Sequence, residues 1–295
     1  MLQNKFLVKM LQKSRVLFGI AIGLSFLHLS SVSRISFHLD SVLGRHVGTQ
    51  LLSMSLIFWG AVLYLLWNKR HTLKLNSGVF SSFFGASLIA LVIFKTISLS
   101  DDDSFLHVSP LISVFGLGLL ASGGKGLKQY WQELFILFVL AVPLEHLIGQ
   151  MIDLAKLTAQ FVNYLLLHLG FEVSRQDVVV SLPTGSIRVD PGCSALRPIA
   201  RLLQLSALIL VMTSTSLIQI IIVPIVAILV AFIVNGIRVA VMALLVAYSS
   251  REMFEFWHMG TGSHTISMLE IMMLWVFCQF FIRQNETDNQ DSVKL

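Results

Sequence analysis

Long runs of apolar residues constrain this chain more than any other feature of its sequence. A helix that crosses a membrane needs about 20 mostly apolar residues, and eight windows of the chain reach or approach that length. These windows are residues 16–30, 50–67, 79–99, 105–121, 131–149, 199–213, 217–248 and 265–282. Only 13% of the residues are charged and the mean hydropathy is +0.80, a composition that excludes an ordinary water-soluble domain. The sequence therefore predicts an all-α polytopic membrane protein with about eight transmembrane helices.

The apolar windows leave room for one domain and a short tail. We expect a single integral membrane domain over residues 1–283, followed by a polar, disordered tail over 284–295 that carries three acidic residues. The net charge of +5 is spread over short loops and forms no basic stripe beside aromatic residues. We therefore expect the lipid bilayer, and no nucleic acid, as a partner.

The charges of the short loops predict how the chain is threaded. Lys and Arg in such loops favour the cytoplasm, and the N-terminal segment and the loops at 68–71 and 125–128 are basic, whereas 101–103 is a run of three Asp. We place both termini in the cytoplasm and the chain in the plasma (inner) membrane. With eight spans, the segment 170–197 and the loop 249–264 then face the extracytoplasmic side.

Two short stretches rich in β-branched residues precede a cysteine. Residues 178–182 and 186–189 flank Pro183-Thr184-Gly185, a pattern typical of a β-hairpin. Open sheet edges are not tolerated in lipid. We therefore expect an extracytoplasmic hairpin insert over 170–192 that leads directly into Cys193.

The segment before the hairpin has a mixed character. In residues 150–168, the polar residues Asp153, Lys156, Gln160 and Asn163 recur every three or four positions, which puts them on one stripe of an otherwise apolar helix. Such a helix either lies in the membrane interface or spans with its stripe facing a polar interior. The sequence leaves both possibilities open.

Cys193 stands between a Pro-Gly turn and the start of an apolar helix, with Arg197 four residues later. The N–H groups of a helix N-terminus and a nearby cation both favour a thiolate, which makes a cysteine a good nucleophile. A small residue tucked into a tight turn would have the same local sequence. Cys278, deep in the last apolar window, is expected to be chemically inert.

Two later segments bring polar groups to the same predicted face. The sequence Asn-Gly-Ile-Arg at 235–238 lies within an apolar stretch, where an arginine either faces a partner, cavity or functional site or extends to the interface. His258 can serve as a general base because the pKa of imidazole lies near neutral pH, and His264 is its rival. A nucleophile, a base and a cation that stabilises an oxyanion form the set that acyl transfer requires.

This constellation resembles the exosortase/archaeosortase family of membrane-embedded cysteine transpeptidases. The likeness covers roughly residues 80–282 and is specific in three segments. They are Pro-Gly-Cys193-Ser-Ala-Leu-Arg197 after the hairpin, Asn235-Gly-Ile-Arg238-Val, and Trp257-His258-Met-Gly-Thr-Gly262-Ser, the last being most similar to the cyanobacterial branch. Family members typically carry Cys-Ser-Gly where this chain has Cys-Ser-Ala at 193–195.

The resemblance implies roles for individual residues. Cys193 would be the nucleophile, Arg238 would stabilise the thiolate or the oxyanion, and His258 would be the general acid and base. The candidates for substrate binding are Arg197, Arg201 and Asn235. The implied substrates are exported proteins with a C-terminal sorting signal, made of a short motif of the Pro-Glu-Pro kind, a transmembrane helix and a basic cluster. Cleavage at the outer membrane face would pass through a thioacyl enzyme, and we expect neither a cofactor nor a metal.

Other functions remain possible on the sequence alone. A transporter or polysaccharide-export component would line a path with Arg238, Glu270 and the polar stripe at 153–163, and Glu270 in the last apolar helix is the residue that it explains best. In an enzyme, Glu270 would pair with Arg238 or another internal polar group. A zinc site of Cys193, His258 and His264 has no ligand motif, and the chain has no His-Glu-x-x-His sequence of a metalloprotease.

Overall fold

The computed structural model describes residues 2–43, 47–98, 103–213, 215–258 and 260–292. It confirms the all-α polytopic membrane fold with a small β-sheet. Within these ranges, six helical stretches are long and apolar enough to cross a membrane. They are Arg15–Arg34, Leu52–Lys69, Val79–Ile97, Phe105–Ala141, Leu217–Tyr248 and Arg251–Ile282.

The predicted count of eight spans is therefore not exact among the described residues. The windows 105–121 and 131–149 fall largely in one candidate stretch, Phe105–Ala141. Helical structure stops after it because Val142 is extended, as a residue before a proline usually is, and Pro143 follows. The stretch Phe105–Ala141 has 37 residues and is interrupted at Gly123 (φ 69°), so it is long enough for two crossings of about 20 residues each.

The window 199–213 falls short for a different reason. Its helix, α8 (Leu196–Met212), has 17 residues and ends where Thr213 becomes extended. At about 1.5 Å per residue such a helix is about 25 Å long, which is less than the hydrocarbon thickness of about 30 Å. The apolar part of α8 is short because polar residues lie on both sides of the window 199–213.

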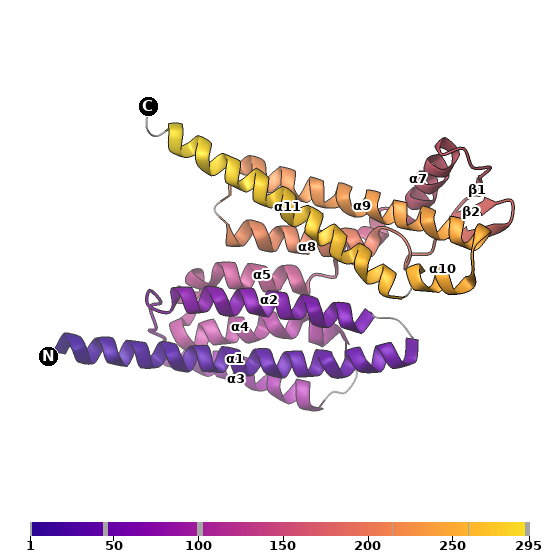
Figure 1. The fold of residues 1–295 in the computed structure, drawn as a ribbon. Helices are drawn as coiled ribbons and strands as arrows, with labels where there is room; N and C mark the ends of the chain where they lie inside the picture. Colours follow the sequence, from indigo (N-terminus) through magenta and orange to yellow (C-terminus); the bar gives the residue numbers. More distant parts are fainter. Residues whose placement is uncertain (1, 44–46, 99–102, 214, 259, 293–295) are drawn as a thin grey trace. The chain divides into compact units, whose positions relative to one another are not determined.

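The helices group into two compact units, Met1–Val142 and Pro143–Leu295, where the sequence predicted one domain over 1–283. The first unit contains α1 (Leu2–Leu43), α2 (Val47–Lys69), α3 (Val79–Ser98), α4 (Asp103–Gly126), the 3-10 turn η1 (Leu127–Tyr130) and α5 (Trp131–Ala141) (Figure 1). Asp101 and Asp102 of the predicted external loop lie outside the described residues.

Close backbone contact and a buried ion pair organise the first unit. A Cβ atom on Gly85 would lie 2.5 Å from the carbonyl oxygen of Gly116, so α3 and α4 approach each other more closely than side chains would allow. The Lys69 Nζ lies 3.1 Å from Glu133 Oε1, which links α2 to α5. This pair gives the fully buried Glu133 a basic partner.

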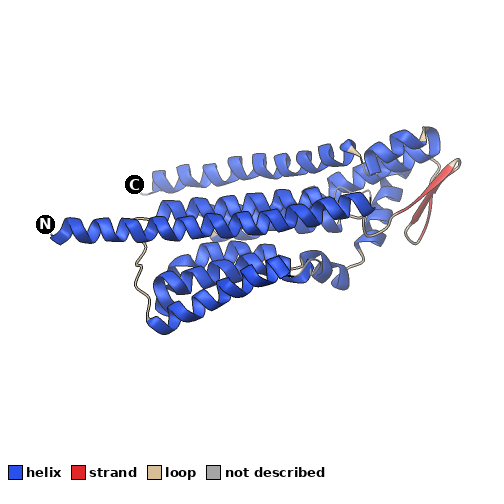
Figure 2. Cartoon of the chain, turned by 90° about the horizontal axis from the view of Figure 1, so that it is seen from below, coloured by secondary structure: helices blue, strands red, loops and turns tan. Residues whose placement is uncertain are grey.

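The second unit contains all the residues that the sequence singled out for chemistry. Its elements are α6 (Leu144–Met151), α7 (Leu154–His168), β1 (Ser174–Gln176), β2 (Val179–Leu182), β3 (Gly185–Arg188), α8, α9 (Leu217–Tyr248), α10 (Arg251–His258) and α11 (Thr261–Ser292). Ser216 and Gln219 form a capping box at the start of α9. Figure 2 shows the strands at the end of this unit that lies away from the carboxyl terminus.

The predicted hairpin is confirmed. Strands β2 and β3 pair antiparallel across Pro183-Thr184, with Leu182 opposite Gly185 and Val179 opposite Arg188. Strand β1, which the sequence did not predict, pairs with the other edge of β2. Its residues, Ser-Arg-Gln, have no β-branched member, and it forms because Asp177 adopts a left-handed conformation (φ 54°) in the turn that follows.

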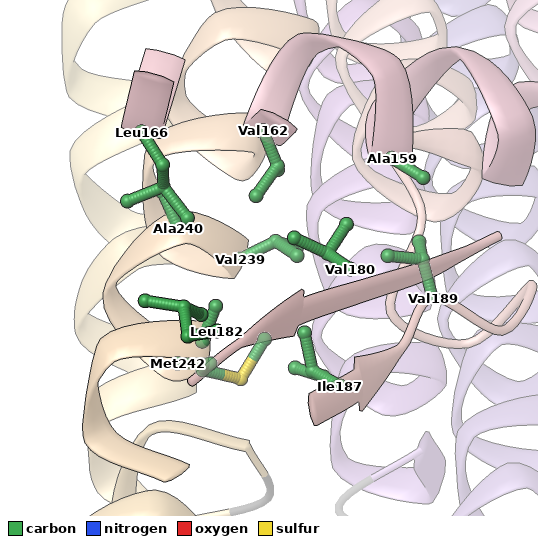
Figure 3. Packing of buried hydrophobic residues seen from close by; sticks show 11 residues of the cluster. Ala159, Val162, Leu166, Val180, Leu182, Ile187, Val189, Val239, Ala240 and Met242 are labelled. Carbon is green, nitrogen blue, oxygen red and sulfur yellow. The ribbon is translucent and has the colours of Figure 1, made fainter. Parts of the chain in front are cut away.

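One face of the sheet packs against α7 and α9 (Figure 3). The buried cluster consists of Ala159, Val162 and Leu166 of α7, Val180, Leu182, Ile187 and Val189 of the hairpin, and Val239, Ala240, Met242 and Ala243 of α9. The hairpin turn is also fixed to α9, because Thr184 Oγ1 donates a hydrogen bond of 2.7 Å to the carbonyl oxygen of Ala247. A Cβ on Gly185 would lie 2.9 Å from the carbonyl oxygen of Val246. The hairpin is thereby held at the carboxyl end of α9.

Helix α7 carries three of the four residues of its polar stripe on the outside, while the fourth, Asn163, is half-buried. Its buried residues are apolar apart from Thr158, whereas Asp153, Lys156 and Gln160 are exposed. The Asp153 side chain caps the helix by accepting a hydrogen bond from the backbone N–H of Lys156. Helix α7 has 15 residues, which gives a length of about 22 Å at 1.5 Å per residue. This is too short to span a membrane, so of the two predicted arrangements the structure favours a helix that lies in the membrane interface.

The carboxyl end of the chain departs from the predicted tail. Helix α11 continues to Ser292, so residues 284–292 are helical where a disordered tail over 284–295 was expected. Once a helix has started, each further residue adds a hydrogen bond at little cost, and Gln and Glu in this segment are good helix formers. Residues 293–295 lie outside the described ones.

Candidate active site

A hydrogen-bonded turn places Cys193 between β3 and α8. The backbone N–H of Cys193 donates to Asp190 Oδ1 at 2.8 Å, and the N–H of Ser194 donates to the carbonyl oxygen of Asp190 at 2.9 Å. Helix α8 begins three residues after the cysteine, with Ala195 at its N-cap. The Cys193 residue is 4% exposed. Sequence reasoning missed Asp190, although an Asp before Pro-Gly is a common signal for such a turn.

His258, the last residue of α10, reaches the thiol. Its Nε2 lies 2.9 Å from Cys193 Sγ, and Phe254, one turn earlier, stacks on the imidazole with ring centroids 4.9 Å apart. The thiol donates this hydrogen bond when the ring proton is on Nδ1. At this distance a proton can pass directly from sulfur to nitrogen. His264, the predicted rival, lies in the first turn of α11.

Arg238 and Asn235, one turn apart on α9, hold the main chain on both sides of the site. Arg238 Nε donates to the carbonyl oxygen of Trp257 at 3.2 Å, and Nη2 donates to that of His258 at 2.9 Å. Its Nη1 donates to Asn235 Oδ1 at 3.2 Å, while Asn235 Nδ2 donates to the carbonyl oxygen of Cys193 at 3.0 Å. The three acceptors of Arg238 are neutral, and the nearby acidic group whose charge acts on it is Glu270, which is itself paired with Arg201.

The glycine between these two residues is explained by the packing of α7. A Cβ on Gly236 would clash with Cδ1 of Phe161, and the Phe161 ring itself packs against Phe232 at a centroid distance of 5.5 Å. No side chain fits at position 236 without moving the aromatic ring. The close approach holds α7 and the hairpin core against the turn of α9 that carries Arg238.

The remaining candidate residues fall into two different environments. Arg197 Nε lies 3.7 Å from Glu145 Oε2, and both side chains are partly exposed. Arg201 Nη2 instead lies 3.0 Å from Glu270 Oε2, where the side chains are only 12% and 1% exposed. Glu270 therefore has the internal partner that an enzyme was expected to give it, and that partner is Arg201. Arg197 stays accessible beside Cys193, whereas Arg201 is committed to a buried ion pair.

The thiol and its surroundings define what the site can do chemically. A thiol within reach of an imidazole, and beside a cation whose hydrogen-bond acceptors are all neutral, is suited to attack a carbonyl carbon and form a thioester. In the ranges that the structure describes, no three His, Cys, Asp or Glu side chains gather as ligands for a metal ion.

The free site holds a neutral thiol, and this differs from the thiolate that the sequence pattern suggests. Burial and the charge of Asp190 raise the pKa of Cys193 to about 12, against the opposing effect of Arg238 and Arg197. The first N–H groups of α8 do not reach the sulfur. Those of Ala195 and Leu196 donate instead to side-chain oxygens of Thr158 and Ser194. The sulfur can therefore react as a nucleophile only after its proton is removed.

This neutral thiol predicts how fast Cys193 reacts with a small uncharged alkylating reagent. Because only the thiolate reacts, a pKa of about 12 leaves about one molecule in ten thousand reactive at pH 8. The rate should then rise about tenfold per pH unit from pH 8 to pH 10, whereas an ordinary thiol levels off above about pH 9. Modification of Cys193 is measured by mass spectrometry of the labelled peptide.

Two substitutions of charged neighbours should shift this profile in opposite directions. Asp190→Asn keeps an oxygen acceptor for the Cys193 N–H but removes a charge that raises the thiol pKa, so alkylation at pH 8 should become faster. Arg197→Gln removes a charge that lowers this pKa, so alkylation should become slower. A shift in the same direction in both variants would contradict the electrostatic account.

Comparison with known proteins identifies the family of the chain. The family model described as transmembrane exosortase matches residues 47–276, which is most of the chain and includes Cys193, Arg238 and His258. No curated protein and no solved structure matches the chain. A thiol, an imidazole and a guanidinium gathered from three segments of a multi-pass membrane protein thus lie within the matched region, and the chain belongs to the transmembrane exosortase family.

Proposed function

We propose that this exosortase family protein is a membrane-embedded cysteine transpeptidase that cleaves C-terminal sorting signals of exported proteins. The observation that carries the proposal is the 2.9 Å separation of Cys193 Sγ and His258 Nε2, beside the guanidinium of Arg238. Their juxtaposition is what thioester chemistry requires.

The proposed reaction has two halves. In the first, His258 Nε2 takes the proton of Cys193 Sγ as the sulfur attacks the scissile carbonyl carbon, and the positive charge of Arg238 stabilises the negative charge that develops. The carbon–nitrogen bond then breaks, and the imidazolium gives its proton to the leaving amine. In the second half, an acceptor amine or water attacks the thioester, His258 takes the acceptor's proton, and Cys193 leaves and is restored as a thiol.

The membrane itself helps to position the proposed substrate. The six candidate spans make this a multi-pass membrane protein, and a substrate anchored by its own transmembrane helix shares the bilayer with it. Its scissile bond is then held at a fixed depth, which replaces a search in three dimensions. The proposed substrates are exported proteins whose signal combines a Pro-Glu-Pro-type motif, a transmembrane helix and a basic cluster. We place the site on the extracytoplasmic face of the plasma (inner) membrane, in keeping with the loop charges.

The alternative of a transporter has less support. Its polar path relied on Glu270 and on the stripe at 153–163, but Glu270 is paired with Arg201. In the stripe, Asp153, Lys156 and Gln160 are exposed on the outer side of α7. A transport path also does not require a thiol within reach of an imidazole, so the transporter alternative leaves the contact between Cys193 and His258 unexplained.

Trapping the thioacyl enzyme tests the proposal. A membrane reporter that carries such a sorting signal is incubated with the protein in vesicles and quenched in acid, which preserves thioesters. We expect a covalent adduct that maps to Cys193 and is released by hydroxylamine. An adduct on another residue, or processing of the reporter with no thioester at any time point, would contradict the mechanism.

A further inference from the structure

The register of the hairpin determines which backbone groups of β3 are already used. In an antiparallel ladder, opposite residues alternate between hydrogen-bonded and non-hydrogen-bonded pairs. The N–H of Val189 donates to the carbonyl oxygen of Val178 at 2.9 Å, which makes Val178 and Val189 a bonded pair. With Val180 opposite Ile187 and Ser181 opposite Ser186, the bonded pairs continue at Ile187 and Gly185.

The backbone N–H and C=O of Ser186 and Arg188 therefore point away from β2. Strand β3 is the last strand of the sheet, and no hydrogen bond among the described residues involves these four groups. Both side chains are also exposed, in contrast to the buried Ile187 between them. The opposite edge of the sheet is less suited to pairing, because β1 has only three residues and offers a single outward residue, Arg175.

The free edge of β3 leads directly to the candidate nucleophile. Arg188 ends the strand, and only Val189 separates it from Asp190, where the turn that holds Cys193 begins. Because Thr184 is bonded to α9, the strand cannot shift independently of the helix that carries Arg238. A peptide laid along β3 would therefore enter the site in a defined register.

The charges around this path favour an acidic peptide. The Arg188 side chain is exposed at the edge, Arg197 is 38% exposed beside the turn, and Arg238 has only neutral acceptors. The exposed Asp190 and Glu145 oppose this field in part. Three arginines along one approach attract negative charge on the segment that binds.

We propose that an extended, acidic segment of the substrate adds to the free edge of β3 as a fourth strand, and that this pairing delivers the scissile bond to Cys193. Backbone hydrogen bonds to Ser186 and Arg188 provide the pairing, and the arginines select for acidic side chains. The inference rests on the proposed function, since it assigns the substrate site of that reaction.

Substituting Ser186 by proline tests the pairing directly. Proline removes the outward N–H of position 186, and it is tolerated where an edge N–H faces away from the sheet. Ser186→Ala is the matched control, because it changes the exposed side chain and keeps the N–H. We expect Ser186→Pro to lower kcat/KM for the sorting-signal reporter about three- to tenfold, the effect of one lost hydrogen bond, mainly through KM. Ser186→Ala should match the native protein.

A second readout separates loss of pairing from loss of structure. The rate of Cys193 alkylation and the thermal midpoint should be the same in Ser186→Pro and Ser186→Ala, because the ladder with β2 is intact in both. Equal processing by Pro, Ala and native proteins would overturn the edge-pairing proposal while leaving the transpeptidase function standing. Absence of processing by the native protein would instead count against the proposed function itself.

A modified substrate makes the same test if Ser186→Pro alters the alkylation rate or the midpoint. In a synthetic reporter peptide, the backbone N–H groups that would pair with β3 are N-methylated, which removes these donors. An unchanged KM for this peptide would overturn the proposal.

The charge preference is tested separately. Arg188→Glu should raise KM for a reporter with acidic residues before the scissile bond, and replacing those residues by Lys should restore part of the loss. If Arg188→Glu raised KM equally for the acidic and the Lys-containing reporter, the proposed selection for acidic segments would be overturned.

Discussion

Replacing Cys193 by Ser is expected to abolish processing of the sorting-signal reporter, with a loss on the order of 10⁴-fold or more. Serine has nearly the size of cysteine and keeps the turn whose N–H bonds to Asp190, so the fold should be retained. Its hydroxyl is far less acidic than a thiol, and the site is built around a sulfur 2.9 Å from His258 Nε2. Processing is followed by the mobility shift of the reporter, and no thioester should be trapped.

The other cysteine provides the control for this experiment. Cys278 is also free and buried but lies in α11, twenty positions after His258. Cys278→Ala should retain processing within about twofold of the native rate, as expected for a residue outside the reacting group. Processing by Cys193→Ser at more than a few per cent of the native rate would rule out a covalent thiol mechanism, and a transporter activity that survives in this variant would favour the alternative function.

Replacing Arg238 by Lys should reduce kcat about 10²- to 10³-fold, the usual effect of losing a group that stabilises developing charge. Lysine keeps the charge, but its single ammonium group cannot reproduce the planar fork that binds three acceptors on two segments. The carbonyls of Trp257 and His258 lose their common donor, so the imidazole is no longer fixed against the thiol. Single-turnover acylation of the reporter measures the loss.

Arg251 is the matched control for Arg238. It lies at the other end of α10, its side chain is 91% exposed, and it pairs with Glu255 at 3.9 Å. Arg251→Lys should therefore leave acylation unchanged. If Arg238→Lys acylates at the rate of Arg251→Lys, then charge alone is sufficient at position 238, and the geometric role of the guanidinium is wrong.

The fold was largely predictable because lipid imposes simple rules on sequence. Apolar length identified the six spans that the structure describes, and the alternation around Pro183 identified the hairpin. The count of spans was less accurate, since α8 has 17 residues and lies at the limit of the usual length. Strand β1 was missed because its stability comes from pairing with β2 and not from its own residues.

The site was predictable where single residues are out of place in their surroundings. An arginine at 238 within an apolar helix and a cysteine after Pro-Gly both draw attention by themselves. The ionisation state of Cys193 was not predictable, because it depends on burial and on the exposed carboxylate of Asp190, which only the folded chain brings near. Likewise, Arg201 was a candidate for substrate binding by its position in α8, and its pairing with Glu270 depends on how α8 and α11 pack.

The contacts of Asn235 and Arg238 have a consequence for how the proposed activity can diversify. Both side chains grip peptide carbonyls, those of Cys193, Trp257 and His258, and a peptide carbonyl is the same whatever residue it belongs to. These hydrogen bonds therefore do not depend on which side chains the bonded residues carry. The nucleophile or the base could be exchanged while the hydrogen bonds that align their main chain are kept. New reactivity can therefore be tested here one substitution at a time.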